Sequence, residues 1–210
     1  RAKWYAPNGV DEEYGFRRNN SFDTVAQECR AVREAVGLAD LTSFAKYEIT
    51  GADAHALLER VCANRVPAKD GGVVLSQMLT TLGGIESEAT VTRMAEDHYY
   101  LLSSAVAELH DFDWLVHHIK PGEDVTVRNV TDDYGVLVLS GPKSREVLSL
   151  LTDAGLGNED GFTWMSAQEI TVADVAVRAL RVSYVGELGW ELHCPMERIG
   201  DLHDVLMRVG

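Results

Sequence analysis

The sequence predicts an α+β fold built from two duplicated β/α subdomains. Predicted strands cluster together instead of alternating strictly with helices, which is typical of α+β proteins. Strand–turn–helix patterns also recur along the chain, which indicates an internal duplication. A composition of 46% hydrophobic and 25% charged residues over 210 positions is that of an ordinary globular protein. A chain of this length can bury a hydrophobic core without a metal or a disulfide to hold it together.

The first predicted element is a helix ahead of the repeats. Apolar residues between Ser21 and Val36 recur at the spacing of three and four that lines one helical face. Gly37 follows as the expected C-cap, because glycine easily adopts the left-handed conformation that commonly ends a helix. Residues 1–40 are therefore expected to form an N-terminal lead-in and helix.

The repeat begins where a strand, a glycine turn and a helix follow one another. The stretches Tyr47–Val61 and Leu137–Leu151 share this pattern, and the two glycines, Gly51 and Gly141, are 90 residues apart. Alternating residues before each glycine predict a strand with one buried face. Apolar residues three and four apart after each glycine predict a helix. The alternative is a chance similarity between two amphipathic strand–helix units.

A second match occurs at the same offset. Tyr99–Ser104 and Gly189–Cys194 each precede a helical pattern, and Tyr100 then corresponds to Trp190. Two matches at one offset favour duplication over chance.

Each subdomain is expected to contain further strands between these anchors. They are predicted at Val73–Leu79, Glu88–Met94, Val125–Val130, Ile170–Val172 and Val175–Tyr184. Glycine-containing turns separate several of them. We expect subdomain 1 to span 41–130 and subdomain 2 to span 131–210, with the second one truncated.

Charge and cysteine usage exclude several classes of partner. The net charge of −14 is the wrong sign for a nucleic acid or an anionic membrane. The sequence has no transmembrane run and no apolar signal core, and the missing initiator Met indicates a fragment or a processed chain. Three widely spaced cysteines predict buried free thiols in a reducing compartment. We expect the cytoplasm, or the mitochondrial matrix in a eukaryote.

Common cofactor motifs are absent from the sequence. It contains no GxGxxG after a strand and no GxxxxGK[ST], so no dinucleotide or P-loop site is predicted. It also lacks HExxH and GxSxG. The histidines have no recognised ligand spacing, and no metal site is expected.

Two motifs resemble the folate-binding aminomethyltransferase family, whose founder is the T-protein of the glycine cleavage system. They are G-G-I-E-S-E at 83–88 and Y-V-G-E-L-G-W-E at 184–191. Other stretches that resemble the family lie at 29–41, 44–47, 63–67, 108–111 and 135–142. The sequences K-W-Y at 3–5 and F-R-R-N-N at 16–20 are most similar to the folate-binding half of dimethylglycine and sarcosine dehydrogenases.

This resemblance implies a fold, a cofactor and a reaction. The fold would be the aminomethyltransferase folate-binding domain with two swapped β/α halves, and the C-terminal barrel of such proteins is absent from this sequence. The cofactor would be tetrahydrofolate, which captures an iminium or methylene unit from an N-methyl amine as 5,10-methylene-tetrahydrofolate. FAD would enter only through a separate or missing flavin dehydrogenase domain, in cis or in trans.

Two other functions stay open at this point. One is a non-catalytic folate sensor or scaffold, because two family contacts are altered at Leu75 and Ser103. The other is a stand-alone aminomethyltransferase of the glycine cleavage type. In each case the expected partners are small molecules, namely a folate and an amine-derived one-carbon unit.

The resemblance makes Glu88 the main catalytic candidate. The family pattern G-G-I-x-D-D places two acids where this chain has Ser87 and Glu88. A carboxylate at position 88 can orient the amine, stabilise an iminium and move a proton. Ser87 beside it is a candidate cofactor contact. The alternative is that Glu88 lies on the solvated edge of a strand.

Four further residues are expected to contact the cofactor. The carboxylate of Glu191 would accept hydrogen bonds from the adjacent N–H groups of the pterin, and Tyr184 would pack an aromatic ring on the folate. Ser103 stands where T-proteins carry Asn, and Met78 would line the pocket. The alternatives are a surface Glu191, core packing for Tyr184 and Met78, and a plain strand Ser103.

The site is expected between the two halves. Glu88, Tyr184, Glu191 and Ser103 should converge on one cavity there, because ligand sites often form between subdomains. Candidate cations for the folate glutamate tail are Arg17, Arg18 and Lys46.

Overall fold

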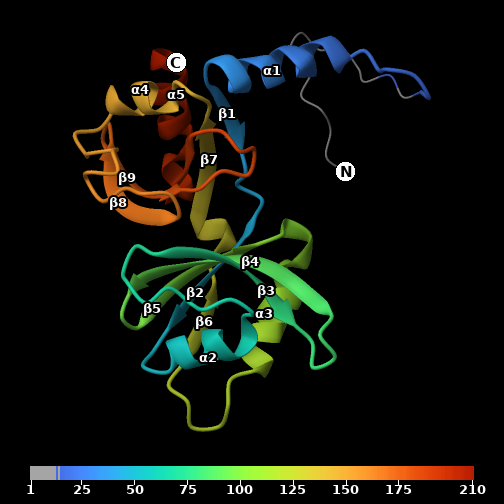
Figure 1. The fold of residues 1–210 in the computed structure, drawn as a ribbon, viewed down its shortest axis with the longest axis vertical. Helices are drawn as coiled ribbons and strands as arrows, with labels where there is room; N and C mark the ends of the chain where they lie inside the picture. Colours follow the sequence, from blue (N-terminus) through green and yellow to red (C-terminus); the bar gives the residue numbers. More distant parts are fainter. Residues whose placement is uncertain (1–12, 14) are drawn as a thin grey trace.

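The computed structural model describes residue 13 and residues 15–210 and contains two five-stranded antiparallel sheets (Figure 1). The predicted lead-in at 1–40 therefore lies partly outside the described residues, and the stretch 3–5 lies wholly outside them. Sheet I has the strand order β3 (Val73–Leu79), β4 (Ile85–Ala95), β5 (His98–Ser103), β2 (Ala45–Thr50) and β6 (Thr126–Asn129). Sheet II has the order β8 (Ser166–Val172), β9 (Val175–Arg181), β10 (Gly189–Pro195), β7 (Tyr134–Ser140) and β1 (Gly37–Asp40).

Helices cover the outer face of each sheet and leave the inner faces to meet. On sheet I these helices are α2 (Ala54–Val61) and α3 (Glu108–His117), and on sheet II they are α4 (Ser144–Ser149) and α5 (Ile199–Val209). Short 3₁₀ turns lie at η1 (Ala105–Ala107), η2 (Thr131–Asp133) and η3 (Met196–Arg198). No helix of the described residues is long and apolar enough to span a bilayer.

The two sheets repeat one topology and exchange their edge strands. In chain order β1 precedes β2, yet it pairs with β7 of the other sheet; β6 precedes β7, yet it pairs with β2. The predicted α+β class with two swapped halves is therefore confirmed. The boundaries expected at 41–130 and 131–210 stay a prediction; all strands of sheet I lie within 41–130, whereas sheet II takes β1 from the expected lead-in at 1–40.

Two glycines fix the crossing points of this exchange. Gly51 and Gly141 have φ values of 121° and 132°, a region that side chains rarely allow. A Cβ atom on Gly51 would lie 2.1 Å from the carbonyl oxygen of Asp124, and one on Gly141 would lie 2.4 Å from that of Ala35. Glycine recurs at both positions because, in each half, the segment that leads into the exchanged edge strand passes too close to leave room for a side chain.

The register corrects one predicted correspondence. Glu48 pairs with Tyr100, and Val138, the match of Glu48, pairs with Glu191. Tyr100 therefore corresponds to Glu191, and the expected match with Trp190 is wrong by one residue. The second strand–helix unit follows its anchor at an offset of 91 residues rather than 90. A shift of one residue exchanges the faces of a strand, so it decides which side chain points inward.

The N-terminal helix also differs from its prediction. Helix α1 (Phe22–Glu34) ends before Gly37, which begins β1 by pairing with Ser140. Pairing with the second sheet thus ends the helix earlier than its apolar spacing suggests. All residues of α1 are at least partly exposed, and the helix projects from the second half (Figure 1). Cys29 is consequently exposed instead of buried.

Candidate functional site

The inner faces of the two sheets meet in a layer that we call the seam. Its buried core comprises Val73, Tyr100, Leu102, Val130, Ala167, Leu180 and Val182. Because strand side chains alternate, the residues that pack under the helices identify those that face the seam. Ala89 and Trp190 pack under the helices, so Glu88 on β4 and Glu191 on β10 are turned toward the seam. The fold thus places one acid from each half on facing sheets.

Glu88 lies on the more open part of this face. It is exposed, and its Oε2 accepts a hydrogen bond of 2.8 Å from Nε2 of Gln77, its partner residue on β3. Leu75 and Leu79, also on β3, are large apolar residues with substantial exposure. The carboxylate of Glu88 is therefore held from one side by an amide and remains accessible to a ligand.

Ser87 points the other way, toward α3. Its hydroxyl donates to Oδ2 of the buried Asp111 at 2.8 Å, and Oδ1 of Asp111 lies 2.9 Å from Nδ1 of His110. Nε2 of His110 is 2.8 Å from Oε1 of Glu86. The hydrogen bonds to Asp111 and Glu86 raise the pKa of His110. This chain of contacts anchors the start of β4, next to Glu88, on the helix.

Glu191 is mostly buried and belongs to a hydrogen-bond chain across the seam. Its side chain is 17% exposed, and its Oε2 is 3.3 Å from Nε2 of His193. Nδ1 of His193 is 3.1 Å from the hydroxyl of Tyr100 on the opposite sheet. His193 is fully buried, and this burial lowers the pKa of its imidazole.

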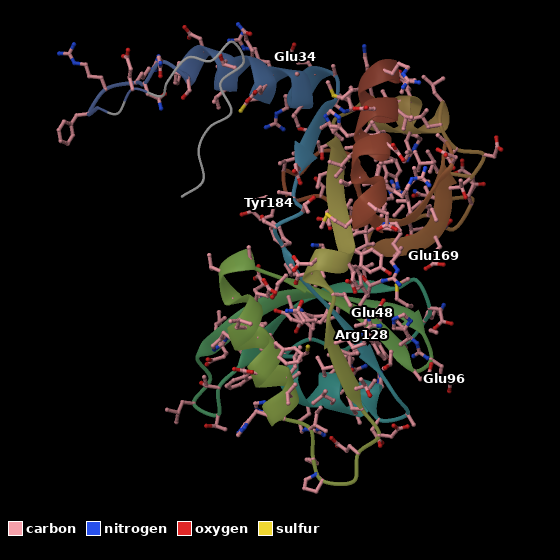
Figure 2. All side chains as sticks on the ribbon, turned by 180° about the vertical axis from the view of Figure 1, so that it is seen from behind. Glu34, Glu48, Glu96, Arg128, Glu169 and Tyr184 are labelled. Atoms are coloured by element: carbon pink, nitrogen blue, oxygen red, sulfur yellow. The ribbon has the colours of Figure 1, made fainter. Side chains whose placement is uncertain are left out.

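Tyr184 lies in the loop between β9 and β10 with its side chain outside the core. The residue is 92% exposed, and the loop that carries it contains Gly186 with φ of 81°. Glu187 of the same loop forms an ion pair with Arg33 of α1. Figure 2 shows Tyr184 at the level of the seam, across from Glu48 and Glu169. Its expected contact with a folate stays a prediction.

Ser103 and Met78 are not brought to the seam. Ser103 is 3% exposed and lies beside the hydroxyl of Tyr47, on the helix side of β5. Met78 is fully buried in the core under α2 and forms a β-bridge with Cys62. Glu88 and Glu191 both face the seam, whereas Ser103 lies on the other face of sheet I. The expected convergence on one cavity stays a prediction, and so does the assignment of Ser103 and Met78 as cofactor contacts.

A charged cluster around Arg178, which was not predicted from the sequence, lies on the other side of the seam from Glu88 and Glu191. Nη2 of Arg178 is 3.0 Å from Oε1 of Glu48, and its guanidinium lies 5.0 Å from the ring of Tyr100 and 4.7 Å from that of Tyr134. A cavity of about 400 Å³ adjoins it, lined in part by His193. Arg178 and Glu48 are 130 residues apart, and no local motif links them.

Lys46 is buried where the chain crosses from one sheet to the other. Its ammonium is therefore not accessible to a folate glutamate tail. Its ammonium donates to the carbonyl oxygens of Thr42 and Phe44, each at 2.8 Å, and to that of Thr131 at 3.2 Å. Burial lowers the pKa of Lys46 to about 8, although nearby carboxylates oppose this shift. Arg18 lies over the ring of Phe22. Within the described residues, no His, Cys, Asp and Glu cluster has the arrangement of a metal site.

Known proteins with similar sequences and structures place this arrangement in a family. Residues 1–210 match the family described as "GCVT N-terminal domain". Dimethylglycine dehydrogenase, mitochondrial, of Rattus norvegicus is 38% identical over 210 residues, which cover 99% of this chain and 24% of the relative. The aminomethyltransferase of Chloroherpeton thalassium is 32% identical over 197 residues, covering 93% of this chain and 53% of the relative.

A solved structure agrees with the sequence relatives. Glycine cleavage system aminomethyltransferase T from Bartonella henselae matches with a TM-score of 0.75 and 28% identity, over 87% of this chain and 48% of that one. The chain thus spans about a quarter of the dimethylglycine dehydrogenase and about half of the aminomethyltransferases that it resembles. The resemblance carried by the two motifs is confirmed, and the chain belongs to the GCVT N-terminal domain family, as an aminomethyltransferase-type domain related to dimethylglycine and sarcosine dehydrogenases.

Proposed function

We propose that this chain binds tetrahydrofolate at the seam and transfers a one-carbon unit to it. The unit is the iminium of an N-methyl amine of the dimethylglycine or sarcosine type, and the product is 5,10-methylene-tetrahydrofolate. The supporting observation is the pair of acids, Glu88 and Glu191, that the two halves turn toward each other's sheets. Family membership adds to this support.

The two carboxylates have different roles in this proposal. Glu191 accepts hydrogen bonds from adjacent N–H groups of the pterin, a pairing that fixes the orientation of the ring. Glu88 faces the reacting nitrogen. As that nitrogen attacks the iminium carbon, a C–N bond forms and the nitrogen's proton passes to Glu88. The proton then moves to the amine nitrogen, whose bond to the one-carbon unit breaks as the neutral amine leaves. The second folate nitrogen closes the five-membered ring and gives its own proton to Glu88.

The oxidation that generates the iminium needs a flavin, which this chain is not proposed to hold. A flavin dehydrogenase domain, in cis or in trans, supplies it. The rat and human relatives named dimethylglycine dehydrogenase support this arrangement. The chain matches about a quarter of each, which leaves room in those proteins for a dehydrogenase domain. Their names include "mitochondrial", so we place the reaction in the mitochondrial matrix of a eukaryote and in the cytoplasm of a bacterium.

Two alternative functions make different predictions. A folate sensor or scaffold would bind without catalysis, and it is favoured by the position of Ser103 on the far face of sheet I. A stand-alone aminomethyltransferase of the glycine cleavage type is favoured by the similarity to the Chloroherpeton enzyme. Formation of methylene-tetrahydrofolate above the uncatalysed rate would exclude the sensor.

Titration with tetrahydrofolate separates binding from chemistry. Glu191→Gln should raise the dissociation constant about 10- to 100-fold, because it weakens hydrogen bonds to a charged acceptor. Glu88→Gln should change the dissociation constant less than about threefold but lower the rate of product formation by roughly 10²- to 10⁴-fold. Calorimetry and a product assay measure the two effects.

Glu169→Gln is the matched control, because Glu169 also faces the seam but lies on the side of Arg178. It should bind and react like the wild-type protein. Equal affinity of wild type and Glu191→Gln would remove Glu191 from the site.

A further inference from the structure

The carboxylate of Glu191 is the end of a chain of three polar side chains that crosses the seam. Tyr100 belongs to β5 of sheet I, whereas His193 and Glu191 belong to β10 of sheet II. The hydroxyl of Tyr100 is 3.1 Å from Nδ1 of His193, and Nε2 of His193 is 3.3 Å from Oε2 of Glu191. Tyr100 and His193 are both fully buried, so solvent does not compete for these contacts.

Hydrogen-bond chemistry fixes the direction of this chain. A carboxylate only accepts hydrogen bonds, so Nε2 of His193 must carry the hydrogen that Glu191 receives. Burial lowers the pKa of His193, which keeps the imidazole neutral at neutral pH. A neutral imidazole has one donor nitrogen and one acceptor nitrogen. Nδ1 is therefore the acceptor, and the hydroxyl of Tyr100 is the donor.

The charged groups around His193 agree with a neutral ring. Lys46 on β2 and Arg178 on β9 both disfavour an added proton on His193, and Glu191 alone favours it. An imidazolium at this position would neutralise the carboxylate of Glu191. A neutral N–H instead holds Oε2 in place and leaves the negative charge for a ligand.

We infer that Tyr100 and His193 are positioning residues that orient the carboxylate of Glu191 for the ligand. This inference rests on the proposed function, because the ligand is the pterin of tetrahydrofolate. Glu191 selects the tautomer of His193, Tyr100 holds the ring by donating to Nδ1, and His193 in turn fixes the plane of the carboxylate. The first half thereby controls a binding group of the second half without touching the ligand.

The test combines a spectroscopic measurement with a binding measurement on the full-length protein. In wild-type protein labelled with ring-¹⁵N histidine, the His193 signals, assigned by their loss in His193→Gln, should show protonated Nε2 and unprotonated Nδ1 without any ligand. Tyr100→Phe should keep this tautomer but shift the ¹⁵N signal of Nδ1, which loses its hydrogen-bond donor. It should also raise the dissociation constant for tetrahydrofolate about 5- to 20-fold, the effect of one lost hydrogen bond acting on a charged group.

Tyr134→Phe is the control, because Tyr134 also packs against Tyr100 and Arg178 but lies outside the chain of hydrogen bonds. It should leave both readouts unchanged. Protonated Nδ1 in the wild type, or a shifted Nδ1 signal in Tyr100→Phe with unchanged affinity, would overturn the inference alone. Absence of tetrahydrofolate binding by the wild type would overturn the proposed function together with the role of these residues in ligand recognition.

Discussion

The two halves of the molecule share a topology but differ in the side chains that they present at matched positions of the seam. Where the first half has Glu48 and Tyr100, the second half has Val138 and Glu191. Where the second half has Arg178, the first half has Thr90. The register of the strands establishes each match.

These differences give the two sides of the seam different chemistry. On one side the guanidinium of Arg178 is stacked on tyrosine rings and paired with Glu48. On the other side the matched positions hold the small Thr90 and the acidic Glu191. A duplicated fold thus supplies two equivalent surfaces, and a few substitutions place a paired guanidinium on one of them and not on the other.

The largest expected effect comes from removing Arg178. Arg178→Ala should lower the free energy of unfolding by about 3 kcal/mol, because it removes the nearest cation of the mostly buried Glu48 and leaves it the more distant Arg128 at 3.5 Å. Chemical denaturation measures the change. Arg198→Ala, which breaks a more exposed ion pair with Asp174, should cost only about 0–1 kcal/mol. Similar losses of unfolding free energy in both variants would contradict the conclusion that Arg178 stabilises the fold through a mostly buried ion pair.

A second comparison concerns Lys46, which matches the apolar Val136 of the other half. Its pKa is lowered to about 8 in the folded protein by burial, so the unfolded chain binds the proton more tightly. Stability therefore rises with pH as the folded-state amine loses its proton. Between about pH 8 and pH 10 this group should add roughly 2 kcal/mol to the free energy of unfolding.

Lys46→Met should remove this rise, which denaturation curves at several pH values would reveal as the difference from wild type. Lys143→Met changes an exposed lysine and should keep the rise. If Lys46→Met kept the same pH dependence as wild type, the buried amine would not be its source.

The smallest expected effect comes from placing an arginine on the other side of the seam. Thr90→Arg places a guanidinium at the position that matches Arg178, where it should lie over Glu191. It should then raise the dissociation constant for tetrahydrofolate about 10- to 100-fold, since the ligand must displace a charge-assisted hydrogen bond. Thr90→Val is the control for shape and should bind within about twofold of wild type. Normal affinity of Thr90→Arg would break the proposed equivalence of the two sides.

Much of the fold could be predicted from local patterns. The glycines at 51 and 141 marked the duplication because the same close approach of chains recurs in both halves. The offset of 91 at β10 could not be seen in the sequence, because aromatic residues at 99, 100 and 190 fit either alignment. Only the pairing with β7 distinguishes the two alignments.

The candidate site was predictable where strand alternation decides it. Trp190 under the helices requires Glu191 on the seam, and Ala89 requires the same of Glu88. The ion pair of Glu48 with Arg178 was not predictable, since it depends on how the two sheets are stacked. The burial of Lys46 was equally hidden, because its carbonyl partners come from the crossing segments.

The exchanged edge strands have a mechanical consequence. Because β1 belongs to one sheet and β2 to the other, and likewise β6 and β7, the chain passes between the sheets twice, through the short segments 41–44 and 130–133. The ammonium of Lys46 joins these two segments through the carbonyl oxygens of Thr42 and Thr131, so a hinge between the sheets would have to act at both segments at once.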